Sequence, residues 1–194
     1  MGTVIQNSLG RRIDLCDPQV ADMDMQDIAH ALSLICRFGG HVKHFYSVAE
    51  HSLLVADLLE EQGHPSNVVL AGLLHDAHEA FIGDVTTPVK AVLRQHGELD
   101  ELIQKFDLCI AEYAGLSPEM LHCPPVREAD EAALFIEAQY LMPAGLQHFH
   151  APGVSVPTEH NSSAVEWFSR ASLAPSVPVA ARDNFCFLWK CLSA

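Results

Sequence analysis

The feature that most constrains this chain is an apolar segment that leads directly into a group of polar side chains. Residues 68–74 are apolar throughout, which predicts a buried helix. The next residues include His75, Asp76, His78 and Glu79. Because burying an unpartnered charge costs several kcal/mol, polar groups at the end of such a helix need a compensating partner. A divalent cation would compensate His75 and Asp76.

The rest of the chain repeats its apolar residues mostly at helical spacing. Local signals mark the start of three helices. One runs from a Ser47–Glu50 capping box to Gly63, one from residue 66 into the apolar segment, and one begins at Thr87 as N-cap with Pro88 at the first helical position. Further helices are expected over residues 25–36, 98–114, 126–141, 161–172 and 179–192. Residues 142–160, rich in Pro, Gly and His, predict a long loop. The predicted fold is one all-α domain over residues 1–194, with its core at about 25–141 and a C-terminal loop and helices at about 142–194.

Composition excludes several classes of partner. The net charge of −14 disfavours an extended contact with nucleic acid, although a pocket with a few cations can still bind a small phosphorylated substrate. No apolar run reaches the roughly 20 residues that span a bilayer. The start of the chain lacks the pattern of a signal peptide, and the six cysteines form no Cys-x-x-Cys pair. We therefore expect a cytoplasmic protein with reduced, buried cysteines and no membrane partner.

The spacing of the polar group favours hydrolytic metal chemistry. Glu79 lies three and four residues beyond Asp76 and His75, so it shares their helix face and could stand beside a metal-bound water. Histidine and carboxylate ligands with open positions are typical of hydrolytic sites, because the metal lowers the pKa of bound water. Further ligands must come from other segments. His51 follows the capping box, and Asp130 lies in a later helix, where a lone aspartate is ambiguous by itself.

Together these residues resemble the H…HD…D signature of the HD-domain superfamily of metal-dependent phosphohydrolases. The finer similarity is to the YfbR-like 5′-deoxynucleotidases and the phage dATP triphosphohydrolases (DatZ-like). It rests on residues 29–38, 47–52, 74–80 and 83–90 and extends over about residues 25–137. The resemblance implies a single HD-domain helical bundle.

The resemblance also implies roles for individual residues. His51, His75, Asp76 and Asp130 would bind one divalent cation, either Zn²⁺, Co²⁺, Mn²⁺ or Mg²⁺. Glu79 would orient or deprotonate the attacking water, or protonate the leaving oxygen. A second carboxylate, Asp84, would act as an acid–base group or contact the sugar. In some proteins of the superfamily extra histidines bind a second cation, and His78 and His44 are the alternatives for that role here.

Five residues are the expected substrate contacts. Arg37 matches the position that grips phosphate in the family, and Lys90 would add a second cation. Arg94, one turn beyond Lys90, extends this set by spacing alone. Phe38 stands where the bacterial nucleotidases carry a tryptophan, which leaves base and sugar selectivity open. His44 could contact a phosphate instead of a metal.

The expected function is hydrolysis of a deoxynucleotide to release the deoxynucleoside. The leading expectation is a dATP or dNTP triphosphohydrolase, and the first alternative is a 5′-deoxynucleotidase acting on dNMPs. A dinuclear HD phosphodiesterase and a non-catalytic nucleotide-binding HD module are further alternatives. The resemblance also implies a homo-oligomer, either a dimer or a hexamer. If the chain is phage-encoded, it would act in the host cytoplasm.

Overall fold

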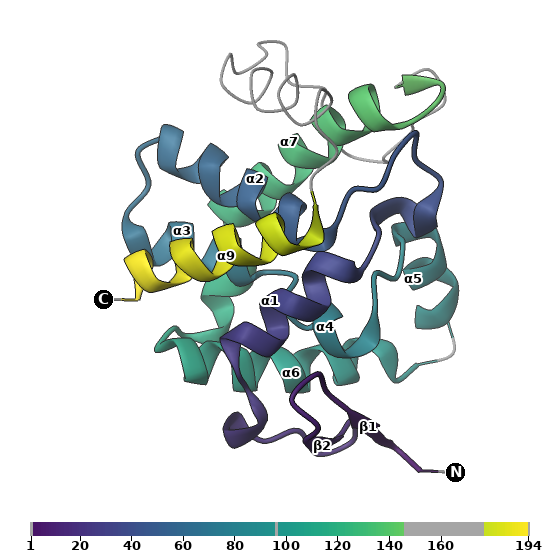
Figure 1. Cartoon of the computed structure of the whole chain (residues 1–194), viewed down its shortest axis with the longest axis vertical. Helices are drawn as coiled ribbons and strands as arrows, with labels where there is room; N and C mark the ends of the chain where they lie inside the picture. The colour runs from purple at the N-terminus through teal and green to yellow at the C-terminus, as the bar shows by residue number, and fades with distance from the viewer. Residues whose placement is uncertain (1, 96, 146–176, 194) are drawn as a thin grey trace.

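The structure is a computed structural model that describes residues 2–95, 97–145 and 177–193. It confirms the expected all-α class (Figure 1). The helices are α1 (Met25–Leu34), α2 (Val48–Glu61), α3 (Ser66–Leu74), α4 (Glu79–Ile82), α5 (Thr87–Arg94), α6 (Leu99–Ala114), α7 (Pro124–Leu141) and α9 (Pro178–Leu192), with 3₁₀ turns η1 (Val20–Asp22), η2 (Arg37–Gly40) and η3 (Pro118–His122). An N-terminal hairpin of β1 (Val4–Gln6) and β2 (Arg12–Asp14) was not expected, because three-residue strands are too short to show a two-residue period.

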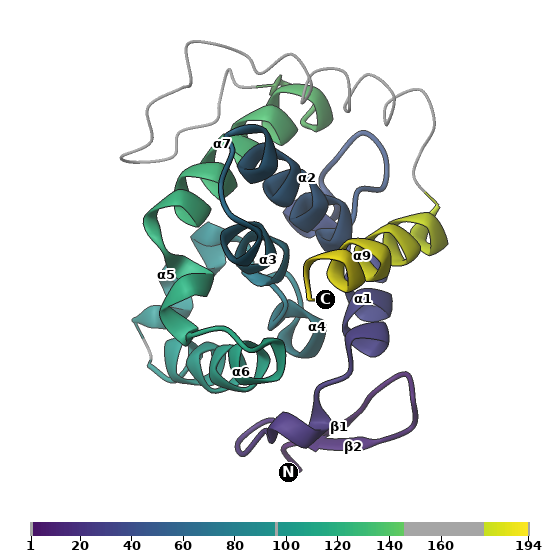
Figure 2. The same cartoon turned by 90° about the vertical axis from the view of Figure 1, so that its left-hand side faces the viewer.

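Helices α2 and α3 form the centre of the bundle. Helix α2 packs against α1, α3, α7 and α9, and α1 lies beside α9 (Figures 1 and 2). Residues 69–74 of α3 are all buried, as the apolar segment predicted. Gly72 allows α3 to approach α2 closely, since a Cβ atom there would collide with the Leu59 side chain. The polar residues that follow α3 are therefore held against a tightly packed core.

The helix ends agree with the sequence in part. Ser47 and Glu50 form the expected capping box at the start of α2: the Glu50 amide donates to Ser47 Oγ at 3.2 Å, and the Ser47 amide donates to Glu50 Oε2 at 2.8 Å. Helix α5 follows Thr86 rather than Thr87 as its N-cap. Helix α1 ends at Leu34, before the expected glycines, because the chain becomes extended and Cys36 forms a β-bridge with Ser47.

The tail and the cysteines depart from expectation in two ways. Helix α9 confirms the helix predicted at 179–192, whereas the helix predicted at 161–172 and nearly all of the predicted loop at 142–160 lie outside the described residues. The six cysteines are unpaired, but of these only Cys109 is buried, and Cys16 and Cys191 are exposed. Within the described ranges, no helix combines the length and apolar character that crossing a membrane requires.

The Asp57 carboxylate on α2 makes the stability of the protein depend on pH. Burial, together with the neighbouring charges of Glu60 and Glu61, raises the pKa of Asp57 to about 6. The side chain also lies near the negative C-terminal end of its helix. The raised pKa means that the folded protein binds a proton at Asp57 more tightly than the unfolded chain does. This contribution to the free energy of unfolding is complete below the ordinary pKa of 3.8 and is lost as the pH rises through about 6.

We therefore expect Asp57→Asn to stabilise the protein above this window and to have little effect below it. The expected gain is about 1 kcal/mol at about pH 8, reduced for the solvent that reaches this half-buried group, and close to none at about pH 4. Thermal unfolding of both proteins at the two pH values measures the difference. An equal gain at both pH values contradicts the assigned cause.

Candidate metal centre

Four of the expected metal ligands converge from three helical segments. His51 lies in the first turn of α2, His75 and Asp76 follow the last turn of α3, and Asp130 lies in α7. The Nε2 atoms of His51 and His75 are 3.3 Å apart. Asp130 Oδ1 lies 3.1 Å from His51 Nε2, and Asp76 Oδ2 lies 3.3 Å from His75 Nε2. His51, His75 and Asp130 therefore form one group whose ligand atoms all lie within 4.8 Å of one another, and Asp76 lies beside its two imidazoles. Imidazoles with carboxylates are the donor set of a mixed nitrogen and oxygen metal site.

The outer nitrogen of each imidazole has a fixed partner. His51 Nδ1 lies 2.6 Å from a carboxylate oxygen of Glu137, and His75 Nδ1 lies 2.7 Å from the carbonyl oxygen of Gly72. Both partners only accept hydrogen bonds, so each Nδ1 carries a proton and donates it. The two Nε2 lone pairs then face each other, which is repulsive unless a positive charge lies between them. This arrangement fits a bound cation, because metal-ligating histidines are oriented in the same way.

The electrostatics of the cluster point to the same conclusion. His51 and His75 are buried. Burial disfavours an imidazolium, yet the Asp76 and Asp130 carboxylates raise the pKa of His75 well above its ordinary value. Hydrogen bonds from the two histidines hold the pKa of Asp130 below its ordinary value, although its partial burial acts in the opposite direction. The cluster thus stabilises a positive charge at its centre, either a proton or a metal ion.

Local structure explains how the ligands come together. The capping box fixes the first turn of α2 and with it the buried His51. His75 continues the last turn of α3 as its C-cap residue, and its ring returns to the carbonyl of Gly72. Asp130 is the most solvent-accessible of the ligands, with 41% of its side chain exposed. Among the described residues, the cluster is therefore most open to solvent at α7.

The sequence analysis missed Glu137, a carboxylate that is completely buried beside the cluster. It lies two turns beyond Asp130 on the same face of α7. Besides holding His51, its Oε2 accepts a hydrogen bond from Arg37 Nη2 at 3.1 Å. A glutamate between the apolar Ala133 and Leu141, one turn to either side, was a detectable signal, but its partners lie 86 and 100 residues away in the sequence.

Arg37 and Phe38 lie at the edge of the centre. The Arg37 guanidinium is buried, and its Nη1 lies 3.6 Å from Asp76 Oδ2. Its Cζ stands 5.6 Å from the centroid of the Phe38 ring. Phe38 adopts a left-handed backbone conformation, with φ at 57°. The structure thus brings Arg37 next to the candidate ligand Asp76 and holds it there through Glu137, and the expected phosphate contact of Arg37 stays a prediction.

Glu79, Lys90 and Asp84 form the second part of the site. Glu79 is 1% exposed, and its Oε1 accepts a hydrogen bond from Lys90 Nζ at 3.3 Å. Burial and the Asp76 charge raise the pKa of Glu79 to about 8, although Lys90 opposes this shift. Burial also raises the pKa of Asp84, and one of its oxygens is buried without a hydrogen-bond partner among the described residues. A buried carboxyl with a pKa near neutrality is suited to proton transfer.

Two expected substrate contacts gain no support from their surroundings. Arg94 Nε lies 2.9 Å from Asp100 Oδ1, and about half of the Arg94 side chain is exposed. The structure therefore pairs Arg94 with α6 instead of with the site residues. His44 is half-buried in the loop before α2 and has no hydrogen-bond partner within the described part of the chain.

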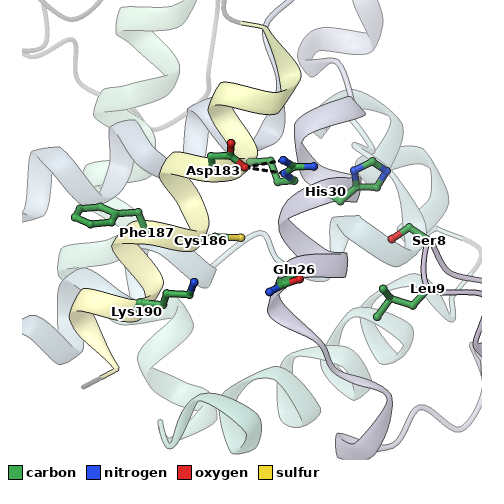
Figure 3. Close-up of a pocket in the computed structure, with 9 residues that line it drawn as sticks. Ser8, Leu9, Gln26, His30, Asp183, Cys186, Phe187 and Lys190 are labelled. Atoms are coloured by element: carbon green, nitrogen blue, oxygen red, sulfur yellow. Dashed lines mark hydrogen bonds and ion pairs between the residues drawn. The ribbon is translucent and has the colours of Figure 1, made fainter.

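A separate hollow of about 640 Å³ lies between the β1–β2 loop, α1 and α9 (Figure 3). Ser8 and Leu9 line it from the loop, His30 from α1, and Cys186 and Phe187 from α9. None of the expected site residues lines this hollow. The candidate active site is therefore the ligand cluster of His51, His75, Asp76 and Asp130, and it lies outside this hollow.

The role of Glu137 leads to a testable expectation. Glu137→Gln replaces a charged acceptor by an amide whose NH₂ group faces Arg37 or His51. We expect divalent-cation affinity to fall roughly 10- to 100-fold, as is typical when the partner of a ligating histidine is lost. Competition with a chromogenic chelator measures the dissociation constant. The exposed Glu128 on the same helix provides the matched control, Glu128→Gln, and equal affinities for the two variants contradict a role for Glu137.

Comparison with known proteins places these residues in one family. The sequence matches the HD domain family over residues 44–139, a range that contains all four candidate ligands. It is 38% identical over 154 residues to the uncharacterized protein YfdR of Escherichia coli K12. The aligned region covers 79% of this chain and 77% of YfdR. It is also 39% identical over 140 residues to an uncharacterized protein of Rhodobacter capsulatus, covering 68% of this chain and 69% of that protein.

Proposed function

The chain belongs to the HD-domain family, and from this premise we propose that it hydrolyses deoxynucleotides at the His51–His75–Asp76–Asp130 centre. HD domains are in general metal-dependent phosphohydrolases. The single observation that carries the proposal is the pair of facing Nε2 atoms, 3.3 Å apart and flanked by two carboxylates. The deoxynucleotide as substrate is supported by the resemblance of residues 83–90 to the deoxynucleotide-specific members.

A divalent cation in this centre would lower the pKa of a bound water and withdraw charge from a phosphoryl oxygen. The residues of the chain supply the remaining functions. His51 and His75 are held by Glu137 and Gly72 with their Nε2 lone pairs directed inward. Arg37 stands beside Asp76, where its guanidinium can bind a phosphate oxygen of the substrate.

Glu79 is the proposed acid–base group. Burial and the neighbouring Asp76 charge raise its pKa to about 8, which favours the protonated carboxyl that can donate a proton to a leaving oxygen. In the proposed reaction the water oxygen forms a bond to the α-phosphorus, and the bond from phosphorus to the 5′ oxygen breaks. The 5′ oxygen takes a proton from Glu79, and the attacking water restores that proton. The products are the deoxynucleoside and either triphosphate or phosphate.

The leading proposal for the substrate is a deoxynucleoside triphosphate such as dATP. A specific observation favours the alternative, a deoxynucleoside monophosphate. Arg37 is paired with Glu137, and Arg94 is paired with Asp100. Two of the cations expected to bind a long phosphate chain are therefore already neutralised, and a single phosphate needs fewer of them.

A substrate panel tests the proposal. The metal-loaded protein is incubated with every deoxy- and ribonucleotide at the mono-, di- and triphosphate level, and the products are separated by chromatography. We expect deoxynucleoside to be released from at least one deoxynucleotide, with triphosphate or phosphate as the second product. Hydrolysis of ribonucleotides alone, or of no nucleotide under any of the four expected metals, contradicts the proposal.

A further inference from the structure

The hollow between the β1–β2 loop, α1 and α9 has no role in the proposed reaction. Its volume of about 640 Å³ is typical of small-molecule sites, which range from about 300 to about 1,000 Å³. Among the described residues, those that line it are all distinct from those of the metal centre. The hollow is therefore a candidate for a separate binding function.

Both walls of the hollow are held in place by the rest of the protein. The Ser8 amide in the β1–β2 loop donates to Asp27 Oδ1 at 2.9 Å, and the Ser8 hydroxyl donates to the same oxygen. Asp27 lies in α1 and is 4% exposed, so the loop is fixed to that helix. On the other side, α9 packs along α1 and buries Phe185 completely in the core. Because the walls are already ordered, a ligand loses little affinity to ordering the protein.

The charges that line the hollow favour an anionic ligand. Arg182 and Asp183 neutralise each other, since Arg182 Nη2 lies 2.7 Å from Asp183 Oδ1. Lys190 lies two turns beyond Asp183 on α9 and has no ion-pair partner within the described residues (Figure 3). The chain as a whole carries a net charge of −14, which repels anions from most of its surface. An ammonium group without a partner beside a hollow is therefore a local site of anion attraction.

The uncharged lining favours a ligand that also has an apolar body. Phe187 on α9 is 69% exposed, the largest value among the large apolar side chains of the described residues, and Leu9 in the loop is 48% exposed. The Cys186 thiol points from α9 toward α1 (Figure 3). Covering apolar groups of this size removes them from water, which stabilises a complex. Gln26 and His30, one turn apart on α1, offer hydrogen bonds to a polar edge of the ligand.

We propose that this hollow is a binding site for a small organic anion with an apolar body, such as an aryl or alkyl carboxylate. The acidic group of the ligand pairs with Lys190, and its apolar body covers Leu9, Cys186 and Phe187. Because the hollow and the metal centre share no residue among those described, the ligand does not compete with a nucleotide for the centre.

Calorimetric titration of the full-length protein with 2-naphthoate tests the site. We expect saturable binding of one molecule per chain. The neutral 2-naphthamide has the same apolar body, and acetate has the same charge without that body, so both should bind at least about tenfold more weakly. Absence of saturable 2-naphthoate binding rejects the site, and equal affinity for either of the other two compounds rejects the proposed class of ligand.

Variants of Lys190 place the bound anion. Lys190→Gln should weaken 2-naphthoate binding about five- to tenfold, whereas Lys190→Arg keeps the positive charge and should restore most of the affinity. Lys105→Gln is the control, because Lys105 is a partly exposed lysine on α6 that does not line the hollow. Equal affinities of Lys190→Gln and Lys105→Gln mean that the carboxylate binds elsewhere, the metal centre included, and contradict the proposal.

Two thiols on α9 give an independent readout on the natural protein. Cys186 lines the hollow, whereas Cys191 is exposed on the same helix and does not line it. Saturating 2-naphthoate should slow alkylation of Cys186 by iodoacetamide and leave that of Cys191 unchanged, as measured by peptide mass spectrometry. Equal rates at Cys186 with and without 2-naphthoate overturn the proposal. Because neither experiment uses a nucleotide, failure of this site leaves the proposed function standing.

Discussion

Replacing Asp76 by alanine is expected to abolish both tight cation binding and nucleotide hydrolysis. Asp76 Oδ2 lies 3.3 Å from His75 Nε2 and 3.6 Å from His51 Nε2, so its loss removes a negative ligand from the centre. Turnover should fall by about 10³-fold or more, since the metal-activated water is lost. Metal content after dialysis and the rate on the best nucleotide of the panel measure the two effects.

Asp183→Ala is the matched control for this prediction. Asp183 is an exposed aspartate on α9 that pairs with Arg182. This variant should keep its bound ion and its rate. If Asp76→Ala retains a stoichiometric ion and measurable turnover, Asp76 is not a ligand, and the assignment of the centre is wrong.

Glu79→Gln is expected to separate catalysis from tight metal binding. The amide preserves the size of the side chain but cannot donate and recover a proton as the carboxyl does. We expect the rate to fall roughly 10²- to 10⁴-fold, the usual contribution of general acid–base catalysis. The ion held by His51, His75, Asp76 and Asp130 should remain bound. Steady-state kinetics and metal analysis of the same preparation give both numbers.

The exposed Glu101 on α6 provides the control for Glu79. It forms an ion pair with Lys105 on the protein surface, and Glu101→Gln should leave the rate unchanged. A full rate in Glu79→Gln shows that another group moves the proton. Loss of the tightly held ion in that variant shows instead that Glu79 is a ligand of the first centre.

Local signals in the sequence predicted much of the fold. The capping box at Ser47–Glu50 and the apolar segment that forms α3 depend on neighbours within a few residues, and both are present in the structure. The hairpin of β1 and β2 was missed because its strands have three residues each. Element boundaries shifted where a distant partner intervened, as in the bridge between Cys36 and Ser47 that follows α1.

The site residues that belong to a motif with fixed residue types in the sequence could be predicted. Those whose role depends on a contact with a distant residue could not. His51, His75, Asp76 and Asp130 come together as the pattern predicted. Sequence order contains no information about Glu137 holding His51. The exposed ion pair between Arg94 and Asp100 could not be predicted from the sequence either. Helical spacing alone therefore assigned Arg94 to the substrate.

The most direct test of the central claim is the position of a bound cation in a crystal of the metal-loaded protein. Anomalous scattering at the absorption edge of Zn²⁺ or Co²⁺ locates the ion without reference to activity. The account predicts a peak bordered by the Nε2 atoms of His51 and His75 and by carboxylate oxygens of Asp76 and Asp130. A fully loaded crystal with its ion elsewhere and nothing between these four side chains contradicts it.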